Sequence, residues 1–327
     1  MKTALIALAK LAVSVILLTL VARAFDTRGL VDRIANLSAA DALIALAIAM
    51  AIMPFQALGW KVVLDESGRD VAGQSFPYAR ALGVLWIGQF FSQVLPSSVG
   101  GDAMRMWYAH KSGMRAGDAI ITVVVDRAIS LLGVLVLAAC GLPWLLRLLP
   151  QGAARSAIVV LIAAGAVGFV AVALLAGNPR WLPRWRVARA LLAPAVLLRR
   201  VLLSPARLLP ALAFSITGTV GFCALVYQLA RALGVALEFQ DCLLLFPPVM
   251  FASAIPVSVG GWGMREGAMV IAFGYAQVPA ADAFAISVLF GLVLLVMSLP
   301  GIAYWLARGD AAGSLAQAQR LAKSQSG

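Results

Sequence analysis

The stretch PSSVGGDAMR, at residues 96–105, recurs 160 residues later as PVSVGGWGMR, at residues 256–265. Seven of the ten aligned positions are identical, and the alignment needs no gap. Each copy follows two long apolar runs and precedes one more, so the same order of runs occurs twice. This repetition predicts a chain built from two related halves, at about 1–150 and 151–310.

The chain as a whole is too apolar for a water-soluble protein. Hydrophobic residues make up 62% of the chain and charged residues 12%, whereas soluble domains are roughly half apolar and a quarter charged. The apolar residues form eight long runs, at 4–22, 42–64, 81–100, 119–142, 157–176, 209–233, 243–259 and 283–306. Most are near the roughly 20 residues of a membrane-spanning helix, and they lack the alternation of barrel strands. The predicted fold class is therefore an all-α polytopic membrane protein, with 1–327 as a single integral membrane domain.

The runs 81–100 and 243–259 differ from the others because they lead into the repeated motif. Proline and paired glycines break a helix. In hydrocarbon, a broken helix leaves backbone groups unpaired, and such breaks survive only where protein or a water-filled cavity surrounds them. We therefore expect these two runs to enter the membrane and return on the same side, as re-entrant broken helices, which leaves about six full spans.

The distribution of basic residues sets the expected orientation. The segment 177–208 carries seven arginines, and no acidic residue occurs between Arg127 and Glu238. Cytoplasmic loops are enriched in lysine and arginine, so this segment should be cytoplasmic. With six crossings, eighteen basic residues lie on the cytoplasmic side and seven outside, and both termini, including a polar tail at 311–327, are cytoplasmic. We expect a multi-pass protein of the cell inner (cytoplasmic) membrane.

Three crossings in each half would invert the second half relative to the first. Inverted repeats with broken helices meeting near the membrane midplane are typical of secondary transporters. The alternative is eight simple transmembrane helices with the N-terminus outside.

The two motifs also predict a binding site for a phosphate group. After the paired glycines the chain can restart as a helix, from Asp102 to about Lys111 and from Trp262 to about Gln277. A helix start exposes free amides and a partial positive charge, and an arginine lies one turn further on in each copy. The candidate substrate-binding residues are Ser98, Gly100, Gly101, Asp102 and Arg105 in the first copy, Ser258, Gly260, Gly261, Arg265 and Glu266 in the second, and Gln89, Gln93, Asp126 and Arg127 nearby.

A purely structural role for these residues stays open. The motifs could be turns whose small residues let helices pack closely. Asp102 and Glu266 could simply neutralise their arginines, or one of them could exchange a proton during transport.

Several other classes of function find no support in the sequence. The chain has a single histidine and three cysteines without metal-ligand spacing, and it contains no ATP-binding motif, so we expect no catalytic residue, metal or cofactor. The net charge of +12 lies in loops between apolar runs, which favours topology and anionic lipid over nucleic acid.

Residues 93–102 with Arg105, the pair Asp126 and Arg127, and residues 256–266 together resemble the lysylphosphatidylglycerol synthase transmembrane-region family, whose members are also described as flippase-like domain proteins. The resemblance covers almost the whole chain. In the full-length synthases this region is similar to a lipid flippase and is joined to a soluble domain that transfers an amino acid from aminoacyl-tRNA. Because this chain ends soon after Arg308, we expect no synthase activity and no enzyme.

The resemblance implies a flippase or transporter that moves an anionic or phosphate-bearing lipid between leaflets. That lipid could be a phospholipid, an aminoacyl-phospholipid or a polyprenyl-phosphate-linked carrier. The alternatives are an integral-membrane transferase acting on lipid-linked substrates, and a non-transporting partner of a lipid-synthesis enzyme.

Overall fold

The computed structural model describes residues 37–67, 75–94, 99–148, 152–176, 186–254 and 262–307. Within these residues the chain forms eleven α-helices and no strand, which confirms the predicted all-α fold class. The helices are α3 (Ala39–Ser67), α4 (Tyr78–Val94), α5 (Val99–Lys111), α6 (Ala116–Cys140), α7 (Leu142–Leu148), α8 (Ala153–Leu175), α9 (Arg186–Leu202), α10 (Pro205–Ala232), α11 (Phe239–Ala254), α12 (Met264–Gly274) and α13 (Ala280–Ala307).

Five of these helices, α3, α6, α8, α10 and α13, are long and apolar enough to cross a membrane. Each corresponds to one of the apolar runs predicted as a full span. The sixth expected crossing, at 4–22, lies outside the described residues. The chain is therefore a multi-pass membrane protein.

The two predicted interruptions separate α4 from α5 and α11 from α12. Helix α5 begins at Val99, earlier than the expected start at Asp102. Helix α12 begins at Met264 and ends at Gly274, inside the expected range. Helix α12 starts two residues later than expected because Gly263 has a φ of 88°, a left-handed conformation that a helix cannot include.

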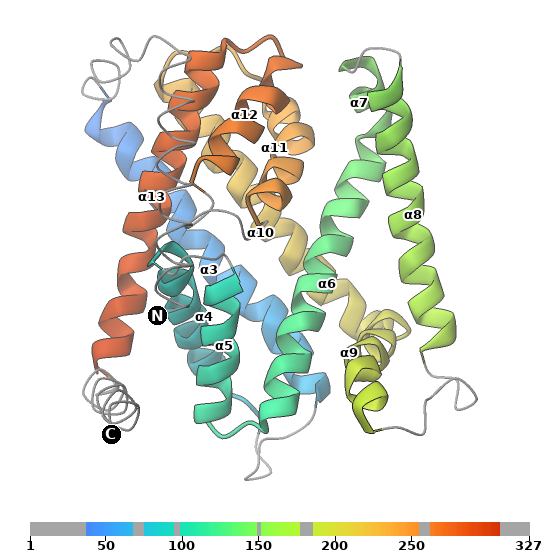
Figure 1. The fold of residues 1–327 in the computed structure, drawn as a ribbon. Coiled ribbons are helices and arrows are strands. Elements are labelled where there is room, and N and C mark those ends of the chain that lie inside the picture. The colour runs from blue at the N-terminus through green and yellow to red at the C-terminus, as the bar shows by residue number, and fades with distance from the viewer. Residues whose placement is uncertain are drawn as a thin grey trace, which may run out of the picture.

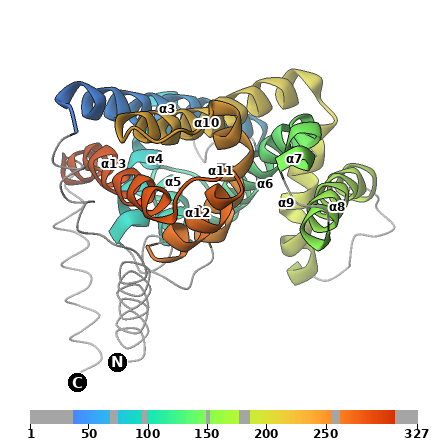
Figure 2. The ribbon, with the colours of Figure 1, turned by 90° about the horizontal axis from the view of Figure 1, so that it is seen from above.

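The two helix pairs occupy opposite halves of the molecule. Figure 1 shows α4 and α5 in the lower half and α11 and α12 in the upper half. In Figure 2 the long helices α3 and α10 lie side by side along one edge. Helix α13 packs against both long helices. Helices α7 and α8 lie at the far side, where the apolar stretch of α8 has no buried residue. The fold thus packs α4 against α3 and α11 against α10, with α5 beside α4 and α12 beside α11.

Helices α4 and α13 pack with almost no space between their backbones. A Cβ atom on Gly301 would collide with the backbone oxygen of Trp86, and one on Gly83 would collide with the ring of Tyr304. The rings of Phe91 and Trp305 add an edge-to-face contact with centroids 5.7 Å apart. Small residues that allow close helix approach are a common means of association in membranes.

Candidate functional site

A cavity of about 590 Å³ lies among α3, α4, α5, α6, α10, α11, α12 and α13. Eight of the predicted site residues line it: Gln89, Gln93, Gly101, Asp102, Arg105, Asp126, Arg127 and Arg265. Gly100 and Glu266 are described but are not among the lining residues. Ser98, Ser258, Gly260 and Gly261 lie outside the described residues. Both repeated motifs therefore contribute an arginine to one cavity.

Arg105 is the most enclosed of the basic groups on the α5 side. Only 3% of it is exposed, and it bonds two carboxylates, Asp126 at 2.7 Å and Asp102 at 3.2 Å. Its guanidinium carbon lies 4.5 Å from the centre of the Trp60 ring, in a cation–π contact. Gly88 leaves room for this side chain, because a Cβ atom there would collide with Arg105.

The Nε atom of Arg105 is buried and has no hydrogen-bond partner among the residues that the structure describes. A buried donor left without a partner costs about 1–3 kcal/mol. Because Arg105 also lines the cavity, a ligand there could supply the missing acceptor.

Arg127 connects α6 to the first motif. Its Nε and one terminal nitrogen each donate to Asp102 at 2.7 Å. The adjacent Asp126 turns to Arg105 instead, as expected for neighbouring residues on a helix, which point in different directions. Asp126 and Arg127 thus both reach the motif, and they join α5 and α6 through one ionic network.

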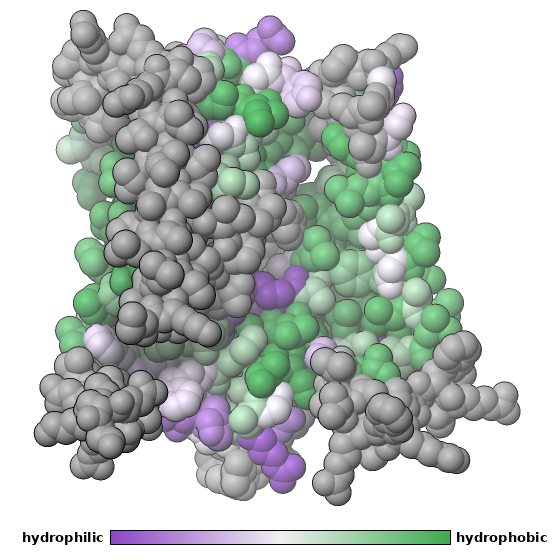
Figure 3. Space-filling model, viewed as in Figure 1, coloured by the Kyte–Doolittle hydropathy of each residue, from purple (hydrophilic) through white to green (hydrophobic). Residues whose placement is uncertain are grey.

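Arg127 is exposed at an unusual place. It lies near the middle of the 25-residue helix α6, yet 60% of its side chain is accessible. In Figure 3 the face around α6 and α8 is mostly apolar. A charged side chain within a membrane span is costly and generally marks a functional pathway.

The second motif holds its arginine differently. Arg265 donates to the neighbouring Glu266 at 2.7 Å and to Ser287 of α13 at 3.2 Å. Glu266 is completely buried and also accepts hydrogen bonds from Ser287 and from the backbone amide of Gly263. The Arg265 guanidinium lies 4.7 Å from the Trp262 ring centre. Glu266 thus holds the Arg265 side chain in place, and Glu266 itself does not line the cavity.

The three arginines are matched by three carboxylates, those of Asp102, Asp126 and Glu266. The described part of the site is therefore electrically balanced. Ionic bonds of this kind orient the guanidinium groups, and a phosphate would have to share them with the carboxylates.

Gly101 has a packing role within this site. A Cβ atom at this position would collide with the backbone oxygen of Gly88 and with Ser92 on α4. The glycine thus lets α5 approach α4 closely, as in the structural alternative drawn from the sequence.

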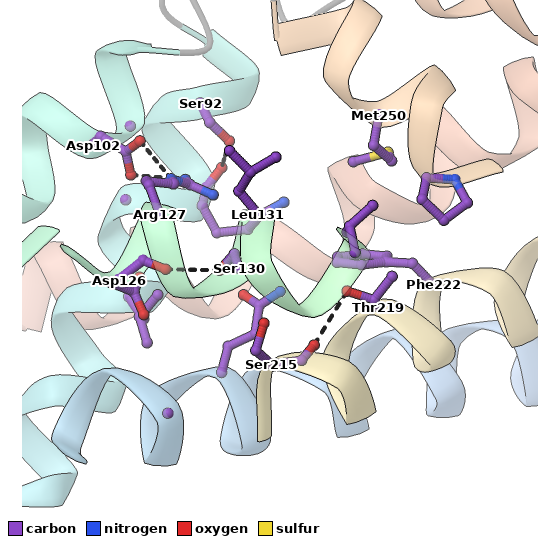
Figure 4. Close-up of a pocket in the computed structure, with 18 of the residues that line it drawn as sticks. Ser92, Asp102, Asp126, Arg127, Ser130, Leu131, Ser215, Thr219, Phe222 and Met250 are labelled. Atoms are coloured by element: carbon purple, nitrogen blue, oxygen red, sulfur yellow. Dashed lines mark hydrogen bonds and ion pairs between the residues drawn. The ribbon is translucent and has the colours of Figure 1, made fainter. Parts of the chain in front are cut away.

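Sequence reasoning missed an uncharged polar wall of the same cavity. Its residues come from four helices: Gln56 of α3, Ser92 of α4, Ser130 of α6, and Ser215 and Thr219 of α10. Figure 4 shows Ser215 and Thr219 on the far side of the cavity from the Asp102–Arg127 pair. The four-residue spacing of Ser215 and Thr219, and of Asp126 and Ser130, was the available signal, since such residues share a helix face.

The chain matches the model of a known protein family. The model of the family described as the lysylphosphatidylglycerol synthase TM region matches residues 7–301. A search of curated proteins finds no match for the chain.

Proposed function

Since the chain belongs to the lysylphosphatidylglycerol synthase transmembrane-region family, we propose that it moves a phosphate-bearing lipid between the two leaflets of the cell inner membrane. The observation that carries this proposal is the enclosed Arg105, which lines the cavity and whose Nε has no acceptor among the described residues. Guanidinium groups recognise phosphate through parallel charge-assisted hydrogen bonds. The lipid phosphate is the natural acceptor for this donor.

The size of the cavity fits a headgroup. Ligand pockets are typically about 300–1,000 Å³, and this cavity of about 590 Å³ lies within that range. The headgroup would occupy the polar cavity while the acyl chains stay in the surrounding lipid. The exposed Arg127 provides a charged group at which a phosphate could leave the lipid phase.

The two helix pairs are interpreted as re-entrant hairpins of two inverted repeats, with both termini cytoplasmic. Their positions in opposite halves of the molecule support this reading. Gly141 and Gly301 are also 160 residues apart. A Cβ atom on Gly141 would collide with Leu244 of α11, and one on Gly301 would collide with Trp86 of α4. Broken helices that meet from opposite faces around one site are the architecture of secondary transporters.

The test is transport by the purified full-length protein in liposomes containing phosphatidylglycerol with a fluorescent acyl chain. An impermeant quencher reaches only the outer leaflet of protein-free vesicles. With the protein present, the inner-leaflet label should also be quenched as lipid moves outward.

Other outcomes identify the alternatives. Chemical conversion of a lipid-linked substrate without movement would indicate an integral-membrane transferase. If neither movement nor conversion occurs, and activity of a co-purifying lipid-synthesis enzyme depends on this chain, the accessory role would replace transport.

A further inference from the structure

Helix α9 connects two long apolar helices at the same end of the bundle. It follows α8, which ends at Leu175, and precedes α10, which begins at Pro205. Because consecutive spans cross the membrane in opposite directions, these two helix ends lie at one membrane surface. Figure 1 shows α9 at that end of the bundle, and in Figure 2, where α8 is seen nearly end-on, α9 extends sideways. The helix therefore lies at the boundary between lipid and water.

One side of α9 is apolar and packs on the bundle. Leu197, Leu198 and Val201 are buried, and α9 contacts α3, α6, α8 and α10. The helix is strongly amphipathic, but it is not hydrophobic overall. This composition is typical of helices that lie in the membrane interface rather than cross the bilayer.

The other side of α9 carries arginines. Arg186, Arg189 and Arg200 occupy positions three and eleven residues apart, which fall on one face of a helix. Arg200 is exposed, and no described residue forms an ion pair with it. The nearest acidic residues along the chain are Asp126 and Glu238, so this segment contains no acid of its own. The charge of this face is complementary to an anionic surface.

Two other arginines of this region bind to the protein itself. The Nε of Arg199 donates to the carbonyl of Ala173 in the last turn of α8 at 2.9 Å, and Arg207 pairs with Glu66 of α3 at 2.6 Å. The last carbonyls of a helix have no partner within it, so Arg199 satisfies one of them at the end of α8. Helix α9 thereby supports α8, whose apolar stretch has no buried residue.

We propose that the arginine face of α9 binds the phosphate groups of anionic lipids in the membrane leaflet that it borders. Arginine recognises phosphate through charge-assisted hydrogen bonds, and the exposed Leu192 and Leu203 beside this face suit the start of the acyl chains. Bound headgroups hold α9, and with it the end of α8, at the membrane surface. This surface is separate from the cavity, because no described side chain of α9 lines the cavity.

The experiment measures which lipid is enriched beside α9 when the full-length protein is reconstituted into phosphatidylcholine vesicles. A fluorophore is attached at Leu203→Cys, directly after α9, in a protein whose exposed Cys140 is replaced by serine. Separate samples receive phosphatidylserine or phosphatidylcholine with the same nitroxide on the acyl chain. Phosphatidylserine should reach the same quenching at about one fifth of the concentration, the effect of one basic residue beside an anionic lipid. Salt at about 0.5 M should reduce this ratio by screening.

Variants locate the preference on α9. Arg186→Gln, Arg189→Gln and Arg200→Gln together should bring the ratio of the two concentrations toward one. The matched control is Arg147→Gln, Arg155→Gln and Arg231→Gln, which removes the same charge near the opposite ends of α8 and α10. This control should keep the ratio of the unmodified protein. Both variants are first checked for a single symmetric peak in size-exclusion chromatography.

Equal quenching by the two lipids in the unmodified protein would overturn the proposal and leave these arginines as orientation signals alone. A ratio that stays about fivefold in the α9 variant, or that falls equally in the control variant, would also remove the preference from α9. The assay involves no lipid movement between leaflets, so its outcome is independent of the proposed transport.

Discussion

Replacement of Arg105 by alanine should reduce lipid movement in liposomes roughly 10- to 100-fold, the effect of losing one charge-assisted hydrogen bond of about 1.5–3 kcal/mol. Arg105 lines the cavity from within, and its Nε has no acceptor in the described part of the chain. Arg265→Ala should cause a similar loss, because the second motif supplies the other enclosed arginine of the cavity. Both rates are measured by the quenching assay.

Loss of folding must be separated from loss of binding. Arg105→Ala leaves Asp126 without its basic partner, so each variant is first checked for a single symmetric peak in size-exclusion chromatography. Arg105→Lys keeps the positive charge but loses Nε and the planar fork, and it should fold while still transporting slowly. Arg115→Ala, at an exposed residue before α6, is the matched control and should transport normally. Rates equal to the unmodified protein in both the Arg105→Ala and Arg265→Ala variants would exclude these arginines from the site.

Replacement of Glu266 by glutamine should destabilise the protein by about 3–5 kcal/mol, the range for breaking a buried ion pair. Glu266 is fully buried and accepts hydrogen bonds from Arg265, Ser287 and the Gly263 amide. A neutral amide would leave the Arg265 charge buried without its partner. The measurement is the thermal unfolding temperature in detergent.

Two control variants test whether the lower unfolding temperature comes from breaking the buried ion pair. Glu238→Gln makes the same change at an exposed acid and should leave the unfolding temperature unchanged. Arg265→Gln combined with Glu266→Gln removes both charges and should recover most of the lost stability. If Glu266 instead carried a proton during transport, glutamine would mimic its protonated form. Native stability in the Glu266→Gln variant would then count against a structural ion pair and favour proton exchange.

The sequence predicts the membrane spans and both interruptions well, for local physical reasons. Long apolar runs form helices in lipid because every backbone group must be paired internally. Proline marks where two of these helices end, since α4 stops at Val94 shortly before Pro96 and α11 stops at Ala254 shortly before Pro256. The predicted break at Gly100 and Gly101 was wrong, because both glycines lie inside α5. The conformation of Gly263, which delays the start of α12, cannot be recognised from composition.

The partners within the site depend on long-range contacts. Asp126 lies 21 residues from Arg105, and Arg127 lies 25 residues from Asp102. Only the packing of α5 against α6 determines which carboxylate meets which guanidinium. The position of Glu266 behind Arg265, outside the cavity lining, was likewise not deducible from its place beside Arg265 in the chain.

The uncharged wall was missed for a related reason. Helices α3 and α10 are apolar on nearly all sides, so the amphipathic pattern that reveals which face a helix buries is weak in both. Gly59 and Gly133 allow close approach to α10 beside Ser215. The packing of α3 and α6 against α10, rather than any local pattern in the sequence, turns Ser215 and Thr219 toward the site.

The most direct test of the account is the sidedness of the two helix pairs. A single cysteine is introduced at Ala116, the first residue of α6, or at Pro279, between α12 and α13, in a protein whose exposed Cys140 is replaced by serine. Sealed vesicles of known orientation are then treated with a membrane-impermeant thiol reagent. Opposed hairpins predict that position 116 reacts from the cytoplasmic side and position 279 only from the other side. Reaction of both positions from the same side would contradict the inverted arrangement and the transport mechanism built on it.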